Sequence, residues 1–362
     1  MPSSASRRAP PGSWCVACPV TCETCSDSPD ASPGCAAGPR RRSCSTRRVP
    51  PSRAVSARHE PVLVAEVLGF LCNGPGLYLD ATLGDGGHAE ALLEAEPGAR
   101  LLGNDRDAAS LAFARERLAR FGERVMLSHG TFRELPEALA RAGTEPLTGA
   151  LFDLGLSSRQ VDDAARGMSY RLEGPLDLRM DPDRGEPVAR RLARVSEEEL
   201  EVVLRERGDV PQARRLSRAI VAAARSGALA TTGSLAALAG RGLSGRERTR
   251  RLSQVFQALR MWVNEEGEDL EAALAWLERA LRPGGVVVTL SYHSGEDRRI
   301  KRTLRGTPVA LPRRLPETST MRPPERPWQE LTRRVVTPSR REQTSNPRSR
   351  SARLRAFRRI QE

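Results

Sequence analysis

Apolar runs alternate with amphipathic stretches along the first half of the chain. Residues 77–80, 100–104, 125–128 and 149–153 are short apolar runs with the length of buried strands. The segments between them, and residues 64–71 ahead of them, place apolar side chains at helical spacing. Strands that alternate with helices in this way predict an α/β fold built on a doubly wound parallel sheet.

The alternation stops at about residue 160 and resumes about a hundred residues later. Residues 161–260 are polar and helical in pattern, with Gly and Pro breaks, and Ser196 begins a capped helix with Glu199. This stretch is too long for a loop, so we expect an inserted all-α subdomain. The α/β pattern then continues with a helix over 262–281, a strand over 286–290, and final strands over 331–337 and 351–358. The expected division is 58–160 and 261–362 for the two parts of one α/β domain and 161–260 for the insert.

The first 57 residues have a different composition. They hold six of the seven cysteines and are rich in Ser, Pro and Arg, so we expect a disordered extension. Cys15, Cys18, Cys22 and Cys25 could supply four thiolates, but the three-residue gap between the pairs is too short for the usual zinc finger, and no metal is expected. An over-extended reading frame and an organelle transit peptide are alternatives for this segment.

A glycine turn follows the first predicted strand. The sequence from Asp80 to His88 is Asp-Ala-Thr-Leu-Gly-Asp-Gly-Gly-His, and Asp105 ends the second strand eighteen residues after Gly87. This order of a strand, a glycine turn, a helix and a second strand that ends in an acid is typical of the first part of a nucleotide-binding unit. The glycines let a ligand approach the backbone, and the acid can hold a ribose. The residues of this unit that we expect at a cofactor are Asp80, Gly84, Gly86, Gly87 and Asp105.

Charge decides which nucleotide is expected. Asp85 lies where the pyrophosphate of a dinucleotide would meet the helix N-terminus, and an anion there repels an anion. S-adenosylmethionine (AdoMet) has no phosphate: Asp80 can accept from its ammonium, the amides of Gly86 and Gly87 can meet its carboxylate, and Asp105 can take its ribose hydroxyls. The pattern therefore favours AdoMet over NAD. A tight turn with solvated acids is the alternative without a ligand.

Two further strand ends carry candidate catalytic groups. Asp153 ends the fourth strand, Ser157 follows it, and His293 follows the strand over 286–290. Cys72, the one cysteine after residue 57, precedes the first strand, and Lys301 is the one lysine, which disfavours thiolate attack on a pyrimidine and a lysine-dependent 2′-O methylation. Methylation of an exocyclic amine remains, with Asp153 accepting an N–H and Ser157 or His293 close by. The alternative role for Ser157 is a helix cap.

At these residues the chain resembles the RsmH (MraW) family of 16S rRNA cytosine-N4 methyltransferases, over roughly 59–358. The matching blocks lie at residues 59–63, 80–88, 153–158, 166–170, 174–181, 256–260, 262–265, 291–298 and 346–351. The resemblance implies a class I AdoMet-dependent methyltransferase domain, interrupted by a helical substrate-recognition domain. It implies methylation of the cytidine at rRNA position 1402 on the small ribosomal subunit. The family's cofactor contacts map onto Gly86, Gly87, His88, Asp105, Phe132, Asp153 and Gln160, with Phe132 packing on the adenine.

Departures from the family lie in regions expected to face RNA. Gly295 stands where the family usually has Leu, residues 251–255 are Arg-Leu-Ser-Gln-Val in place of an Ala-Thr-Arg run, and residues 208–211 replace a more acidic and aromatic turn. Cofactor binding is therefore more strongly indicated than substrate fit.

The charge distribution indicates a phosphate-rich partner. The net charge is +13, and residues 166–260 alone carry nineteen Arg and twelve acids, while residues 301–362 carry seventeen basic residues and five acids. Basic segments on an otherwise acidic scaffold favour 16S rRNA within the small subunit as partner, although solvated, idle arginines are the alternative. No apolar stretch is long enough for a membrane span, so we expect a cytoplasmic protein with no membrane partner; a homodimer is a further expectation. The competing functions are a catalytically silent RNA-binding assembly factor and an NAD-dependent oxidoreductase.

Overall fold

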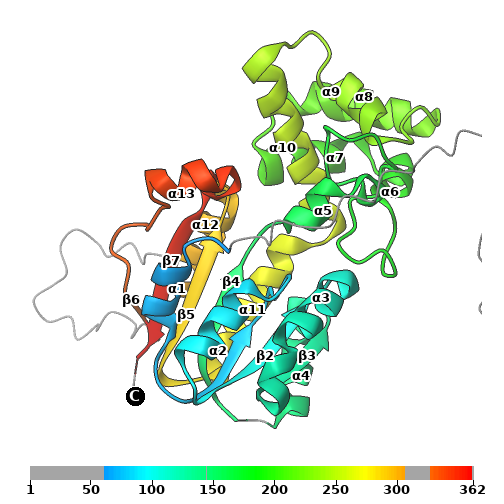
Figure 1. The fold of residues 1–362 in the computed structure, drawn as a ribbon. Helices are drawn as coiled ribbons and strands as arrows, with labels where there is room; N and C mark the ends of the chain where they lie inside the picture. The colour runs from blue at the N-terminus through cyan, green and yellow to red at the C-terminus, as the bar shows by residue number, and fades with distance from the viewer. Residues whose placement is uncertain (1–60, 144, 306–326, 361–362) are drawn as a thin grey trace, which may run out of the picture. The chain divides into compact units, whose positions relative to one another are not determined.

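The computed structural model describes residues 61–143, 145–305 and 327–360. The expectation of a disordered, metal-free extension over residues 1–57 lies outside the described residues. Within the described residues, seven strands form one sheet (Figure 1): β1 (Gly76–Asp80), β2 (Ala99–Asp105), β3 (Val125–His129), β4 (Leu147–Asp153), β5 (Leu281–Ser291), β6 (Trp328–Glu330) and β7 (Arg353–Arg359).

The strand order in the sheet is β3-β2-β1-β4-β5-β7-β6. The pairs among β1 to β5 are parallel, whereas β7 is antiparallel to β5 and β6 is antiparallel to β7. The order reverses at β1 and β4, so the doubly wound α/β prediction is confirmed, but the expectation of a wholly parallel sheet is wrong at its last two strands. The carboxyl ends of β1, β2 and β4 meet at one edge, where such folds bind ligands.

Helices cover both faces of the sheet and form the insert. The helices of the α/β part are α1 (Val64–Leu71), α2 (Gly87–Ala95), α3 (Ala108–Leu118), α4 (Leu135–Ala142), α11 (Glu266–Ala280), α12 (Ser294–Arg305) and α13 (Arg340–Ser345), with α5 (Ser158–Asp162) after β4. The insert contains α6 (Val188–Arg194), α7 (Glu197–Gly208), α8 (Ala213–Arg225), α9 (Thr232–Ala239) and α10 (Gly245–Val263). In Figure 1 these green helices lie above the carboxyl ends of the strands.

Alternation along each strand divides the core of the sheet into two layers. Along β1, Leu77 and Leu79 join a cluster with α4, α11 and α12, whereas Tyr78 joins a second cluster with α1, α2 and α3. Successive strand side chains point to opposite faces, so strands covered on both sides are apolar at nearly every position. This burial explains why the runs at 77–80 and 149–153 are continuously apolar.

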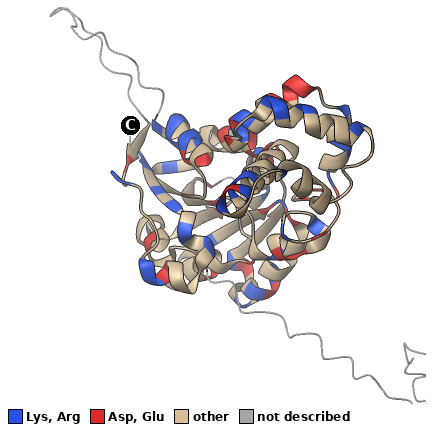
Figure 2. Cartoon of the chain, turned by 90° about the horizontal axis from the view of Figure 1, so that it is seen from above, with Lys and Arg blue, Asp and Glu red and all other residues tan. Residues whose placement is uncertain are grey.

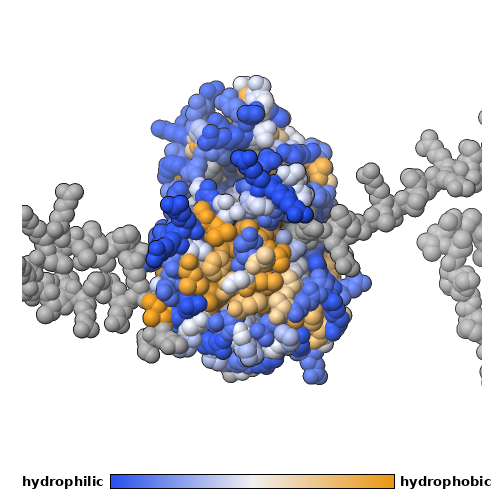
Figure 3. All heavy atoms as spheres, turned by 60° about the vertical axis from the view of Figure 1, so that its left-hand side comes forward, coloured by the Kyte–Doolittle hydropathy of each residue, from blue (hydrophilic) through white to orange (hydrophobic). Residues whose placement is uncertain are grey.

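The insert has a hydrophobic core of its own. Leu192, Leu200, Leu204, Ile220 and Leu259 are fully buried in a cluster drawn from residues 168–259. The predicted capping box at the start of α7 is confirmed, because the Ser196 hydroxyl accepts from the Glu199 amide and the Glu199 carboxylate accepts from the Ser196 amide. A hydrophilic surface covers this lobe, and apolar side chains gather on the part beneath it (Figure 3). None of the described helices is long and apolar enough to cross a membrane.

Two element predictions are wrong. The helix expected over 262–281 is divided: α10 continues to Val263, and α11 begins only at Glu266, because Glu265 adopts a left-handed φ of 51°. The strand expected over 331–337 is absent: β6 ends at Glu330, and Val336 makes only an isolated bridge to Leu354. Pattern alone gave no sign of these breaks, since apolar spacing continues across both of them.

The entry into the insert provides a test of backbone packing. Gly167 has a φ of +66°, and a Cβ there would overlap the Pro175 carbonyl oxygen; Gly185 has a φ of +70°, and a Cβ there would meet nothing within 4 Å. Gly185→Ala should lower the free energy of unfolding by about 1–2 kcal/mol, which is the cost of placing a residue with a Cβ in the left-handed region. Gly167→Ala should lower it by clearly more, because the backbone must also move. Chemical denaturation of both variants checks this, and equal losses would contradict the predicted close approach.

Candidate functional site

The acid at the end of β2 fastens the glycine turn that follows β1. Asp105 Oδ2 accepts from the Gly84 amide at 2.7 Å, and Asp105 Oδ1 accepts from the Asp107 amide at 2.8 Å. Gly84 (φ 53°) and Gly86 (φ 80°) both use the left-handed region, which favours glycine. Burial raises the pKa of Asp105 to about 6, although the hydrogen bonds from Asp107 and Gly84 oppose the rise. The glycine turn after β1 and the acid at the end of β2, which the sequence predicted to lie at one site, are therefore in direct contact.

Asp80 lies beneath the cavity and does not line it. Its side chain is buried, and Oδ1 accepts from the Thr82 amide at 3.1 Å. Burial, together with the nearby charges of Asp153 and Asp105, raises the pKa of Asp80 to about 8, although the hydrogen bonds from Thr82 oppose the rise. Asp80 thus supports the turn from below, and a direct contact between its carboxylate and a ligand ammonium is not part of this arrangement.

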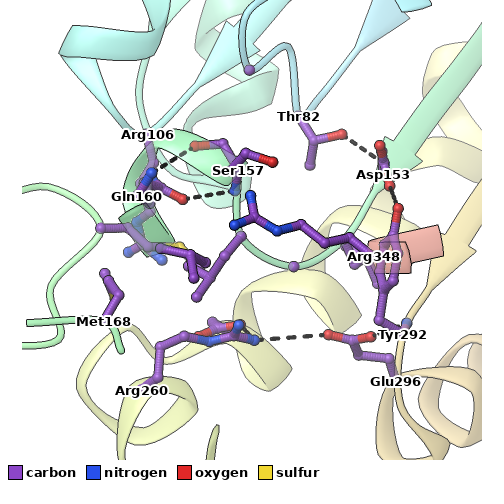
Figure 4. A pocket seen from close by; sticks show the side chains of 18 of the residues that line it. Thr82, Arg106, Asp153, Ser157, Gln160, Met168, Arg260, Tyr292, Glu296 and Arg348 are labelled. Carbon is purple, nitrogen blue, oxygen red and sulfur yellow. Dashed lines mark hydrogen bonds and ion pairs between the residues drawn. The ribbon is translucent and has the colours of Figure 1, made fainter. Parts of the chain in front are cut away.

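Asp153, at the end of β4, is held from several sides. The Tyr292 hydroxyl donates to Asp153 Oδ1 at 2.9 Å, and the Asp153 amide donates to Thr82 Oγ1 at 2.6 Å. Figure 4 shows Thr82 and Tyr292 on either side of Asp153. Burial, followed by the charge of Asp153, raises the pKa of Tyr292 far above its ordinary value, so this phenol stays a donor. Tyr292, just after β5, thus orients the carboxylate, and Thr82, in the turn after β1, holds the backbone of Asp153.

His88 approaches the same carboxylate on its other oxygen. His88 Nδ1 lies 3.6 Å from Asp153 Oδ2, and His88 Nε2 lies 2.9 Å from the Val62 carbonyl oxygen. A carbonyl only accepts, so Nε2 carries a hydrogen, and Nδ1 is the ring nitrogen that faces Asp153.

Ser157 and Gln160 form a helix cap, which was the alternative to a catalytic role for Ser157. Ser157 Oγ accepts from the Gln160 amide at 3.2 Å and Gln160 Oε1 accepts from the Ser157 amide at 3.1 Å, which is a capping box for α5. Gln160 Nε2 donates to Asp107 Oδ2 at 2.9 Å. Ser157 therefore has its structural role, and Gln160 joins the loop after β4 to the loop after β2.

His293 faces a glutamate rather than Asp153. His293 Nε2 lies 2.8 Å from Glu296 Oε1, and Glu296 Oε2 accepts from the Tyr292 amide at 2.9 Å. Although burial opposes it, hydrogen bonding with His293 and the charges of His293 and Arg260 lower the pKa of Glu296. The structure thus gives His293 a part in orienting the β5 end and shows no direct contact between it and Asp153.

A cavity of about 740 Å³ lies between the sheet edge and the insert. This volume is in the usual range for small-ligand sites. The strand ends contribute Gly84, Gly87, His88, Asp105, Phe132, Asp153, Ser157, Gln160, Tyr292 and His293. The opposite wall comes from the insert and includes Met168, Tyr170, Ser253, Phe256, Gln257, Arg260 and Met261. Of the predicted site residues, only Asp80 and Gly86 do not line it.

Known proteins match the chain over almost all of its described part. A family model described as the MraW methylase family matches residues 56–360. The chain belongs to the MraW methylase family. The ribosomal RNA small subunit methyltransferase H of Sorangium cellulosum is 44% identical over 315 residues, covering 86% of this chain and 94% of that protein. The enzyme of that name from Thermomicrobium roseum is 44% identical over 319 residues, covering 84% and 95%.

Membership of the MraW methylase family confirms the family resemblance, the class I methyltransferase fold and AdoMet as the cofactor. The residues present fit that cofactor. The carboxylates of Asp105 and Asp153 line the cavity beside a turn whose glycines expose the backbone, which suits hydroxyl and ammonium donors and disfavours phosphates. Phe132 lines the cavity and meets Phe152 edge-on at 5.3 Å between ring centroids, so it is both a core residue and a surface for a ring.

Sequence reasoning missed Tyr292, Thr82 and Arg260. Tyr292 immediately precedes His293, so the strand-end position was visible in the sequence, but nothing in the spacing indicated that the phenol and not the imidazole contacts Asp153. Thr82 lies within the glycine-turn block. Arg260 ends a helix pattern, where an Arg is ordinarily solvated, yet its guanidinium is buried against Glu266 at 2.8 Å.

The raised pKa of Asp105 predicts a pH-dependent cofactor affinity. The ionised carboxylate accepts from ribose hydroxyls, so AdoMet affinity should be highest above about pH 6 and should fall as the pH decreases through that value and Asp105 is protonated. Asp105→Asn should bind AdoMet more weakly and lose this transition. Calorimetric titration of both proteins between about pH 5 and pH 7 measures it. An unchanged affinity over that range in the unsubstituted protein would contradict the assignment.

Proposed function

We propose that this protein transfers the methyl group of AdoMet to the exocyclic N4 of a cytidine, at position 1402 of 16S rRNA in the small ribosomal subunit. The observation that carries the proposal is the placement of Asp153 in a cavity with a cofactor edge on one side and an aromatic wall from the insert on the other. The relatives' name and the family match support an rRNA substrate of the small subunit.

Asp153 supplies what an exocyclic amine requires. The amine lone pair is delocalised into the ring, so an acceptor on its N–H favours rotation of the lone pair out of conjugation. Tyr292 holds Asp153 Oδ1, which leaves Oδ2 as the oxygen on the His88 side. The bound cofactor supplies an electrophilic methyl group on a sulfonium. With its N–H held by Asp153, the amine would present its lone pair to that methyl group.

The proton balance also uses Asp153. Once the N–C bond has formed, the amine nitrogen carries a positive charge and must lose one proton. Asp153 Oδ2 accepts it and becomes a neutral acid, which then releases the proton to solvent. The raised pKa values of the neighbouring Asp80 and Asp105 show that this edge tolerates neutral carboxyls.

The insert supplies the wall against which a base can lie. Tyr170 meets Phe256 edge-on at 5.7 Å between ring centroids, and both line the cavity with Met168. A base removed from its stack is ordinarily held by aromatic and apolar side chains. The division of the chain into residues 58–160 and 261–362 for the cofactor and 161–260 for RNA recognition is part of this proposal, as are a cytoplasmic location and a homodimer.

Two other functions remain distinguishable. An NAD-dependent oxidoreductase is disfavoured by the match to a methylase family. Asp85 adds little to this argument, because it pairs with Arg159 at 3.0 Å and its charge is compensated. A silent assembly factor would have little use for the buried carboxylates of Asp80 and Asp105, whose raised pKa values show that they are held against a desolvation cost.

The direct test is mass mapping of 16S rRNA after incubation of small subunits that lack the modification with this protein and AdoMet. The expected product is one methyl group on N4 of a single cytidine. Asp153→Asn keeps the shape of the side chain. It should abolish turnover, whereas RNA binding should weaken much less. Normal turnover by that variant would show that Asp153 is not the acceptor, and a methyl group on another atom would contradict the proposed reaction.

Tyr292→Phe tests the orientation of Asp153. Loss of the hydroxyl leaves Asp153 Oδ1 without this donor, so kcat should fall by about 10–100-fold, while the Kd for AdoMet changes little. His293→Gln is the comparison, because its ring contacts Glu296 and not Asp153; its effect on kcat should be smaller. Single-turnover rates measure both, and a larger loss in His293→Gln would reverse the two assignments.

A further inference from the structure

One stripe of α10 forms part of the cavity wall and then continues beyond it. Ser253, Gln257 and Arg260 line the cavity and follow one another at spacings of four and three residues. At 3.6 residues per turn, the same stripe continues toward the N-terminus of the helix through Arg250 and Arg246. Both arginines are exposed. The wall of the cavity therefore extends into a basic surface without leaving the helix.

Several arginines that line the cavity are paired with carboxylates. Arg117, Arg260 and Arg348 pair with Glu90, Glu266 and Asp162, at 2.6–2.8 Å. Within the part of the chain that the structure describes, Arg246 and Arg250 have no carboxylate within ion-pair distance. Basic residues occur throughout the molecule (Figure 2), so the feature that distinguishes this pair is its place on the stripe that also lines the cavity.

The opposite side of α10 has a different environment. Arg248 is displaced from the stripe by about half a turn. Its guanidinium stem lies beside Gly240, where an added Cβ would come within 2.8 Å of Arg248 Nε. Arg248 thus packs along the end of α9 and does not continue the cavity wall. α10 therefore carries the candidate binding pair, Arg246 and Arg250, and also Arg248, which serves as a control.

We propose that Arg246 and Arg250 bind backbone phosphates of the rRNA strand next to the target base, so that α10 guides this strand into the cavity. The proposal rests on the proposed function and extends it to named contacts. The two positions are separated by about 6 Å along the helix axis, and Arg250 precedes the cavity-lining Ser253 by about 4.5 Å. An extended strand with its target base in the cavity can place successive phosphates at such separations.

The chemistry of the surface favours phosphates over other partners. Guanidinium groups pair with phosphate oxygens in a forked geometry, and contacts of this kind position a nucleic acid without selecting its sequence. Arg171, at the cavity rim, is also exposed and without a carboxylate partner in the described residues, and it lies beside the Tyr170 ring. The basic stripe, the rim and the aromatic wall are therefore continuous along one path.

The test compares Arg246→Gln/Arg250→Gln with Arg248→Gln in the full chain. Gln keeps the helix propensity of Arg, so α10 should remain folded. Fluorescence anisotropy with a labelled single-stranded oligoribonucleotide, measured over a range of salt concentrations, gives affinity and salt slope. The double variant should bind at least about 10-fold more weakly, with a salt slope smaller by about 1.4, since each lost phosphate contact on a single strand removes about 0.7. Arg248→Gln should change affinity by less than about 2-fold.

Methyl transfer to small subunits provides a second readout. The double variant should raise KM for subunits, with kcat at saturation and the Kd for AdoMet unchanged. A double variant that matches Arg248→Gln in affinity and salt slope would overturn the proposal. If the unsubstituted protein methylates no subunits, the proposed function fails, but the anisotropy comparison still decides whether this stripe binds phosphates.

Discussion

A single buried carboxylate orders the site: both oxygens of Asp105 accept from backbone amides, one from the glycine turn after β1 and one from the loop after β2. This contact fixes the distance between the two loops that a cofactor must touch. Asp80 and Asp153 end the neighbouring strands, so carboxyl groups gather at this edge. Burial is the main cause that raises the pKa values of Asp80 and Asp105; the charges of Asp153 and Asp105 add to the rise at Asp80, and the charge of Asp107 adds to it at Asp105. A ligand that brings hydroxyl donors and a cation relieves this cost, whereas a pyrophosphate adds to it.

The same loop also positions the insert. Arg106 Nη1 donates to the Asn264 carbonyl oxygen at 2.8 Å, at the break between α10 and α11. The Asn264 side chain in turn binds the backbone of Leu178 and Met180, each at 2.8 Å. The aromatic wall and the strand ends are therefore connected by a short chain of contacts, although they come from distant parts of the sequence. This arrangement explains how a cofactor site and a base site can share one cavity.

The sequence alone was sufficient to predict the features that depend on local residue patterns. Apolar runs located β1 to β5, and the capping boxes at Ser157 and Ser196 were visible as motifs. The break after Val263 was not, because it depends on a left-handed Glu265 and on the tertiary contacts of Asn264. Similarly, the position of Asp153 at a strand end was predictable, but its contact with Tyr292 depends on how β5 lies beside β4. Residue type and spacing thus identify the groups at an edge, and packing decides which of them meet.

The account depends on a cavity that selects a phosphate-free, positively charged cofactor. Calorimetric titration of the purified full chain with AdoMet and, in parallel, with NAD tests this most directly. We predict saturable binding of AdoMet at one site per chain and no measurable heat with NAD under the same conditions. Tight binding of NAD with no response to AdoMet would contradict the account.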